Sequence, residues 1–496
     1  MEKVTRVFFA SVLIILSYSG LYCQWTGNIS ENTGVGVLTG EQVIPKTGQC
    51  SDGSTYISYF SYEGGNYNVR LQLVDYEGNF VWGAEGVLVS DHTSMSWITD
   101  YDLDVDNENN ALITFQDIRI EGNNNVFLYK ISPEGEFLFG EDGIAITNNS
   151  NFDVSPVVLA HQSGNIVVSW QSMSEEGTAI CMQIVSSSGE ALLENPFEMS
   201  GTVDEDYTWP YLVNSSPNSF LMIYYLDTGP YWSPVRYFYA QKFNLEAEEI
   251  WEEPAILSDA GGIMVYVRPD LIPDGNGGAF VSWYDDRELN GMLSAFVQHV
   301  DSAGNVTMEA DGTEVSLNSQ LISIAPVMDF DTVKDELYVF WKSSNSGQNQ
   351  YGMSGQKLDI NGNRKWGDNG TDIINLGEIY ELSFKDAKIS ENGVMVFFTE
   401  GYASSSDTDC RVTRLDYDGG FVWEEEMITI SDAPGSKSDL KVTPAFNEQY
   451  IAVWEDGRND AGDIFAQNIF ENGLIGPDTI PEIIITTPEN DSLIAL

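Results

Sequence analysis

Residues 279–304 read AFVSWYDDRELNGMLSAFVQHVDSAG and carry the pattern from which the fold can be inferred. The stretch begins with an apolar run that ends in the aromatic Trp283. A second apolar run over 296–298 leads to a turn that ends at Gly304, and the large apolar Met308 follows. Short apolar runs bounded by turn residues predict β-strands.

This stretch is one copy of a unit that recurs eight times, at intervals of about 56 residues. The turn ends at Gly78, Gly135, Gly189, Ala247, Gly304, Gly362, Gly419 and Gly473. Four positions later, seven units have Trp82, Phe139, Leu193, Trp251, Met308, Trp366 and Trp423. The aromatic residues that end the first apolar runs are Phe60, Phe115, Trp170, Tyr224, Trp283, Trp341, Phe397 and Trp454. Each unit has room for four short strands, which predicts an all-β, eight-bladed β-propeller of four-stranded antiparallel blades.

The two ends of the repeat region predict how the ring closes. Trp25 lies one repeat length before Trp82, which places an outer strand at 35–43, and the last unit stops soon after Gly473. We therefore expect the N-terminal strand to complete the eighth blade. Residues 24–476 are predicted to form the propeller, and 477–496 a linker or the start of a further C-terminal region. A β-solenoid or tandem sandwiches would be the alternative architecture.

The first residues, 1–23, have the features of a secretory signal peptide. Lys3 and Arg6 precede an apolar run that is too short to anchor the chain in a membrane, and no later segment is long enough. Cys23 allows a second interpretation, a lipid anchor, which the bulky Tyr22 disfavours. We expect a monomer that is secreted or held at the cell surface, with no transmembrane segment.

The charge balance excludes one class of partner. The 496 residues include 76 Asp and Glu against 22 Lys and Arg, a formal net charge of −54. Nucleic-acid binding depends on clustered basic residues, and the sequence has no basic stripe. The acids are spread through all eight units, which favours solubility.

Three units have an Asp two residues before an Arg at the end of a strand. The pairs are Asp117 and Arg119, Asp285 and Arg287, and Asp456 and Arg458. Such an Asp can accept backbone N–H groups of the turn while the guanidinium binds a carboxylate. Because the pair recurs in several blades, we predict a structural role and not a catalytic one.

Residues that interrupt the repeat are the candidate ligand-binding residues. We expect them in loops on one face of the ring, and they are Trp97, Asp204, Glu205, Asp206, Trp209, Tyr231 and Trp232. Aromatic faces suit sugar rings or peptide side chains, and carboxylates accept hydrogen bonds from hydroxyl groups. These residues predict a binding or adhesion module for a glycan or protein ligand. The alternative is a carbohydrate-active enzyme with a carboxylate pair near the axis, whose catalytic residues cannot be assigned from the sequence.

Calcium is the one cofactor to which the sequence points. Asp102, Asp104 and Asp106 alternate and would share one face of a strand, where their oxygens could coordinate Ca²⁺. The run lacks the Gly and the terminal Glu of an EF-hand loop.

Two families resemble the chain at the level of the repeat. Residues 281–287, VSWYDDR, together with FVQ at 296–298 and DSAG at 301–304, resemble repeats of secreted bacterial β-propeller proteins exported by the type IX system. That resemblance implies export and a C-terminal sorting domain, which is not visible here. The spacing from Gly362 to Trp366 resembles quinoprotein eight-bladed propellers. Enzymes of that family hold pyrroloquinoline quinone beside Ca²⁺, often near a disulfide of adjacent cysteines, and this chain has no adjacent cysteines.

Overall fold

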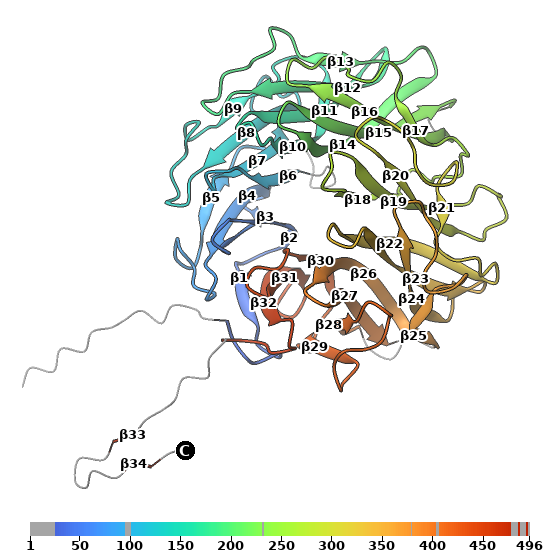
Figure 1. Ribbon diagram of the computed structural model, residues 1–496. Coiled ribbons are helices and arrows are strands. Elements are labelled where there is room, and N and C mark those ends of the chain that lie inside the picture. Colours follow the sequence, from blue (N-terminus) through green and yellow to red (C-terminus); the bar gives the residue numbers. More distant parts are fainter. Residues whose placement is uncertain are drawn as a thin grey trace, which may run out of the picture.

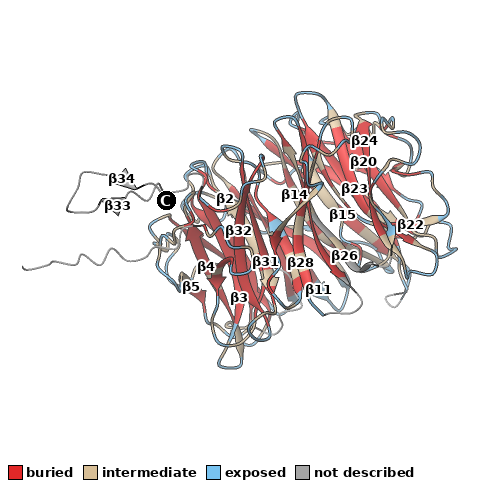
Figure 2. Cartoon of the chain, turned by 90° about the horizontal axis from the view of Figure 1, so that it is seen from below, coloured by how far each residue is buried: buried red, intermediate tan, exposed pale blue. Residues whose placement is uncertain are grey.

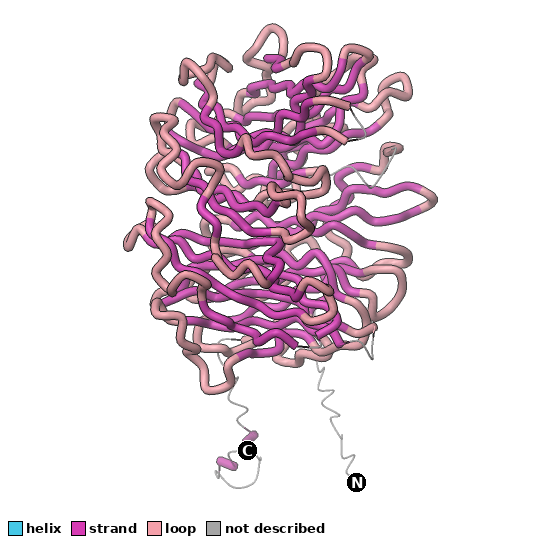
Figure 3. Tube along the Cα trace, turned by 90° about the vertical axis from the view of Figure 1, so that its right-hand side faces the viewer, coloured by secondary structure: helices cyan, strands magenta, loops and turns pink. Residues whose placement is uncertain are grey.

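The computed structural model describes residues 25–94, 101–230, 233–377, 379–402 and 406–477, with two short segments at 485–486 and 493–494. Eight four-stranded antiparallel sheets form a ring around a central axis (Figure 1). Within the described ranges all regular structure is strand, as Figure 3 shows. None of these residues belongs to a helix that could span a membrane. The predicted eight-bladed β-propeller is confirmed.

Each blade contributes one strand to each of four concentric positions. The innermost strands are β2 (Gln42–Gln49), β6 (Asp102–Val105), β10 (Phe152–Ala160), β14 (Glu205–Ser216), β18 (Asp270–Pro273), β22 (Leu321–Asp331), β26 (Ile379–Ser390) and β30 (Lys437–Val442). The second strands are β3 (Thr55–Glu63), β7 (Ala111–Asp117), β11 (Ile166–Ser174), β15 (Ser219–Thr228), β19 (Ala279–Asp285), β23 (Glu336–Asn345), β27 (Gly393–Tyr402) and β31 (Gln449–Asp456).

The remaining strands form the outer half of each blade. The third strands are β4 (Asn66–Val74), β8 (Asn125–Ile131), β12 (Gly177–Val185), β16 (Val235–Asn244), β20 (Ser294–Val300), β24 (Tyr351–Asp359), β28 (Thr408–Leu415) and β32 (Asp463–Phe470). The outermost strands are β5 (Val87–Ser90), β9 (Ile144–Ala145), β13 (Phe197–Met199), β17 (Ala255–Ser258), β21 (Thr313–Glu314), β25 (Thr371–Gly377), β29 (Met427–Ser431) and β1 (Thr33–Gly36). A separate pair, β33 (Ile485–Thr486) and β34 (Leu493–Ile494), follows the ring.

The N-terminal strand completes the eighth blade, as predicted. β1 pairs antiparallel with β32, with Thr33 opposite Ala466 and Gly34 opposite Phe465. The strand is shorter than the expected 35–43, because Gly40 turns the chain with a φ of 104° and β2 then begins the first blade.

The repeated Gly and the repeated large residue pack against each other across neighbouring blades. The Trp25 indole N–H donates to the Tyr76 carbonyl at 2.9 Å, and a Cβ on Gly78 would lie 2.5 Å from the Trp25 backbone nitrogen. One blade later, Trp82 donates to the Pro133 carbonyl at 2.9 Å. The turn therefore needs a residue without a side chain where the preceding blade's tryptophan crosses it.

The core lies within and between the sheets, and exposed residues concentrate in the turns (Figure 2). The second strands supply its largest side chains, which include the fully buried Trp170, Trp283, Trp341 and Trp454. Burial of these aromatic rings stabilises the packing of the blades.

Candidate functional site

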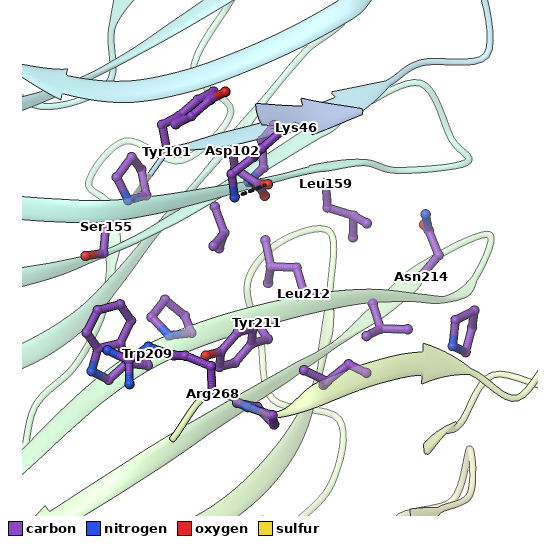
Figure 4. Close-up of a pocket in the computed structure, with 18 of the residues that line it drawn as sticks. Lys46, Tyr101, Asp102, Ser155, Leu159, Trp209, Tyr211, Leu212, Asn214 and Arg268 are labelled. Atoms are coloured by element: carbon purple, nitrogen blue, oxygen red, sulfur yellow. Dashed lines mark hydrogen bonds and ion pairs between the residues drawn. The ribbon is translucent and has the colours of Figure 1, made fainter. Parts of the chain in front are cut away.

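A cavity of about 590 Å³ lies at the centre of the ring, between innermost strands and the residues next to them in six blades. We call it the axial cavity. Its walls combine aromatic, charged and aliphatic side chains, which Figure 4 shows facing a common space. A volume of this size is typical of ligand sites.

Trp209 is the member of the predicted ligand-binding set that reaches the axial cavity. It was expected in a loop but lies within β14, at a bulge between Thr208 and Tyr211 where the pairing register shifts. Its φ is 52° and Pro210 follows. Bulges redirect side chains, and here the indole forms part of the cavity wall (Figure 4).

The backbone at Trp209 belongs to the repeat, whereas its side chain is particular to this blade. Four other innermost strands have a residue with positive φ at the corresponding bulge: Ile44, Ser155, Ala325 and Asp439. The same backbone conformation therefore occurs at five bulges in the described part of the chain, and among these five strands β14 alone has an aromatic residue there.

Arg268 holds the indole in place. Its guanidinium carbon lies 3.4 Å from the centroid of the Trp209 ring. One guanidinium nitrogen, Nη1, donates to the carbonyls of Val265 at 2.8 Å and Val267 at 3.2 Å. A cation stacked on an indole contributes about 0.5–2 kcal/mol, and the two carbonyls fix the plane of the guanidinium.

A second cavity of about 420 Å³ adjoins the first and shares Ser155 and Trp209 with it. We call it the rim cavity. Phe152 and Met173 line it from neighbouring strands and are 41% and 38% exposed. Trp209 therefore lies at the boundary between the axial cavity and the rim cavity, and a ligand packed on it could extend into either cavity.

Cations predominate among the charged side chains of the axial cavity. Lys46, Lys441 and Arg268 line it, and Asp102 is the one carboxylate among its described lining residues. The Asp102 carboxylate lies 3.6 Å from the Lys46 ammonium group, and Figure 4 shows this ion pair. Both side chains are accessible: the Lys46 side chain is 21% exposed and the Asp102 side chain 26%. The lining is net positive in a strongly acidic protein.

The three carboxylates of the predicted calcium site bind groups of the protein. Asp102 accepts the backbone N–H of Val158 at 3.0 Å, and Asp104 accepts that of Ala160 at 2.7 Å. Asp106 lies in the following turn and accepts from Asn110 and from the Lys130 ammonium group. Across the described part of the chain, no group of three or more His, Cys, Asp or Glu residues is arranged to hold a metal ion.

Asp102 and Asp104 belong to a larger set that joins neighbouring blades, which we call the inter-blade carboxylates. Its other members are Asp270, Asp329 and Asp386, which accept from the backbone N–H groups of Met328 at 2.9 Å, Ile389 at 2.6 Å and Val442 at 3.3 Å. Each satisfies an N–H on the innermost strand of the next blade, which has no further strand beside it.

Burial perturbs several of these carboxylates. It raises the pKa of Asp104 to about 7 against the opposing hydrogen bond from Ala160. Burial, with the nearby charge of Asp386, raises the pKa of Asp270 to about 6. Lys388, whose ammonium group lies 2.6 Å from Asp386, has its pKa raised by the surrounding carboxylates in spite of burial. The inter-blade carboxylates are therefore hydrogen-bonded or paired within the fold.

The Asp-x-Arg pairs share one geometry. In each, the Arg backbone N–H and guanidinium both donate to the Asp carboxylate, with closest ion-pair distances of 2.5, 2.7 and 2.6 Å for Arg119, Arg287 and Arg458. Each guanidinium also stacks on a phenylalanine: Phe127, Phe296 and Phe465. The pairs line neither cavity, and their structural role stays a prediction.

The other predicted ligand-binding residues do not join Trp209 at the axial cavity. Asp206 lines the rim cavity, where its carboxylate accepts the Thr178 N–H at 2.6 Å. Asp204 and Glu205 lie farther out, and Glu205 binds Thr202 across an exposed turn. Trp97, Tyr231 and Trp232 fall outside the described residues.

Sequence reasoning missed the cations of the axial cavity. Lys46 and Lys441 are isolated in the sequence, and Arg268 stands in a run without a recognisable motif. Aligning the innermost strands that contain the bulge on the residue after it would have shown a lysine at the same position in the first and last blades, which adjoin in a closed ring.

Comparisons with known proteins show likeness in fold at low sequence identity. No family model and no curated protein sequence matches the chain. Among solved structures, the Dos1 propeller is 10% identical with a TM-score of 0.48, over 90% of this chain and 94% of that chain. The polysaccharide lyase Uly1 is 10% identical with a TM-score of 0.45, over 78% and 91%. The α-L-arabinofuranosidase of Fusarium graminearum, solved with arabinobiose, is 10% identical with a TM-score of 0.37, over 66% and 98%.

Proposed function

We propose that the chain is an exported eight-bladed propeller that acts as a binding or adhesion module and takes a glycan into its axial cavity. The observation that carries this proposal is Trp209, whose indole is held by Arg268 at the boundary of two adjoining cavities. The apolar face of a sugar ring packs well on a fixed aromatic side chain, and the surrounding polar groups can bind its hydroxyls.

Export is proposed from the sequence. The features of residues 1–23 are those of a secretory signal peptide, and the diffuse negative charge would keep the protein soluble outside the cell.

A binding role accounts for the cavity better than hydrolysis does. A glycosidase needs two carboxyl groups on opposite sides of the scissile bond. The described lining of the axial cavity contributes Asp102, and that carboxylate already binds Lys46 and the Val158 N–H. A protein ligand is the second candidate, favoured by the exposed Phe152 and Met173 beside the rim cavity.

Glycan-array binding followed by titration calorimetry with the best ligand tests the proposal. Trp209→Ala should weaken binding at least tenfold, or about 1.4 kcal/mol, because an aromatic residue at the centre of a site contributes strongly. Tyr62→Ala is the matched control, since Tyr62 is 44% exposed and lines neither cavity.

Circular dichroism and thermal unfolding of both variants would show that each retains the fold. Equal glycan affinity in wild type and Trp209→Ala would show that the axial cavity is not the site. Release of reducing ends from the bound glycan would instead favour the enzymatic alternative.

A further inference from the structure

The charge of the axial cavity is opposite to that of the whole protein. Acidic residues outnumber basic ones 76 to 22 in the chain, yet the cavity is lined by three cations and one described carboxylate. The cations come from three different blades: Lys441 from the eighth, Lys46 from the first and Arg268 from the fifth. Basic residues that are far apart in the sequence therefore line the same axial cavity, in a protein where basic residues are the minority.

The fold does not require a cation at these positions. Lys46 and Lys441 are each the first paired residue after the bulge of an innermost strand. The corresponding residues of β10, β14 and β22 are Val157, Tyr211 and Val327, and that of β26 is Asp386. An aliphatic or aromatic residue therefore occupies this position in three blades. Lys46 also pairs with Asp102 at 3.6 Å, and both lysines line the cavity, where an anionic group of a ligand could reach them.

Arg268 adds a positioned group to this pair of lysines. Two backbone carbonyls and the indole of Trp209 fix its guanidinium at the cavity wall (Figure 4). A guanidinium held in one plane suits carboxylate and sulfate groups, to which it can donate two parallel hydrogen bonds. The aromatic face of Trp209 and the anion-binding guanidinium of Arg268 therefore lie in direct contact at the cavity wall.

We propose that the ligand of the axial cavity is an anionic glycan, whose carboxylate or sulfate groups bind Lys46, Lys441 and Arg268 while a sugar ring packs near Trp209. This inference rests on the proposed glycan-binding function and specifies its ligand class. An acidic peptide fits the cavity less well. Extended peptides gain affinity by pairing with an open strand edge, and the inter-blade carboxylates already bind N–H groups along this edge, such as those of Val158 and Ala160.

Short oligosaccharides give the clearest test, because a long polyanion would be repelled by the acidic surface. At about 0.15 M NaCl the screening length is about 8 Å, so distant charges contribute little and the charges inside the cavity dominate. Trigalacturonate supplies carboxylates, a chondroitin sulfate tetrasaccharide supplies sulfates as well, and laminaritriose is the neutral comparison. Titration calorimetry would measure all three.

We expect one of the two anionic oligosaccharides to bind at least tenfold more tightly than laminaritriose. Lys441→Gln should weaken that binding about tenfold and weaken laminaritriose binding by a smaller factor. Arg268→Lys keeps the positive charge but removes the planar guanidinium, and it should also weaken binding of the anionic oligosaccharide. Lys365→Gln is the matched control, because Lys365 is 41% exposed in a turn and pairs with Asp359.

The possible outcomes separate this inference from the proposed function. Equal binding of charged and neutral oligosaccharides, unaffected by Lys441→Gln, would overturn the anionic assignment and leave glycan binding intact. Failure of all three to bind in the calorimeter, together with a blank glycan array, would overturn both. Tighter binding of a polyglutamate peptide than of any glycan would show that the ligand class is wrong.

Discussion

Trp25→Ala tests whether the N-terminal segment holds the ring closed. Trp25 is 2% exposed and packs in a cluster that joins the first and last blades, with Val35, Ile57 and Ile451 among its members. Replacing a buried tryptophan by alanine costs about 3–5 kcal/mol, and the Tyr76 carbonyl would keep only the Gln449 side-chain amide of its two donors. We expect a loss of about 4 kcal/mol in the free energy of unfolding.

Urea denaturation followed by far-ultraviolet circular dichroism would measure this loss. In thermal unfolding it corresponds to a fall of about 4 °C, since a unit of roughly 450 residues has an unfolding entropy near 1 kcal/mol per kelvin. Trp82→Ala is the matched control, because Trp82 makes the same 2.9 Å hydrogen bond between the first two blades but is only half-buried. A Trp25→Ala variant as stable as wild type, or more stable than Trp82→Ala, would refute the closure argument.

Two further predictions concern charged groups inside the fold. Asp285→Asn should destabilise the protein by about 3–5 kcal/mol in urea denaturation, because it leaves the Arg287 guanidinium without its buried partner, and a loss below about 1 kcal/mol would count against the structural role. Stability should also rise as the pH falls from about 8 to 5. The folded pKa values of Asp104 and Glu455 are about 7, above their ordinary values of 3.8 and 4.5, so their contribution is complete at low pH and is lost as the pH rises through 7. Asp359, with a pKa lowered to about 2, acts in the opposite direction below about pH 4. A urea midpoint that falls steadily from pH 8 to 5 would contradict this account.

The architecture could be predicted because it depends on local and periodic signals. The turn glycine and the following large residue recur in register, since Gly78 must pass beneath Trp25 and the same contact is needed in other blades. The limits of β1 could not be predicted in the same way. The apolar residues of 35–43 continue past Gly36, and the backbone turn at Gly40 ends one strand before β2 begins the next.

The candidate site could be predicted only in part, because it depends on contacts between residues in different blades. The sequence predicts Trp209 as a ligand-binding residue because it is an aromatic residue outside the repeat. Its position at a bulge could not be predicted, because tryptophan has no preference for a positive φ. The stacking of Arg268 on that ring joins β14 to the approach to β18. Asp102 and Asp104, which the sequence predicts as calcium ligands, accept N–H groups from a strand more than fifty residues away.

A crystal structure of the protein with whichever of the two anionic oligosaccharides binds more tightly tests the central claim most directly. The account predicts a sugar ring packed on Trp209 within the axial cavity, with a carboxylate or sulfate group within about 3 Å of the Arg268 guanidinium or of the Lys46 or Lys441 ammonium groups. An oligosaccharide bound on another part of the ring, with only water between Trp209 and Lys441, would contradict it.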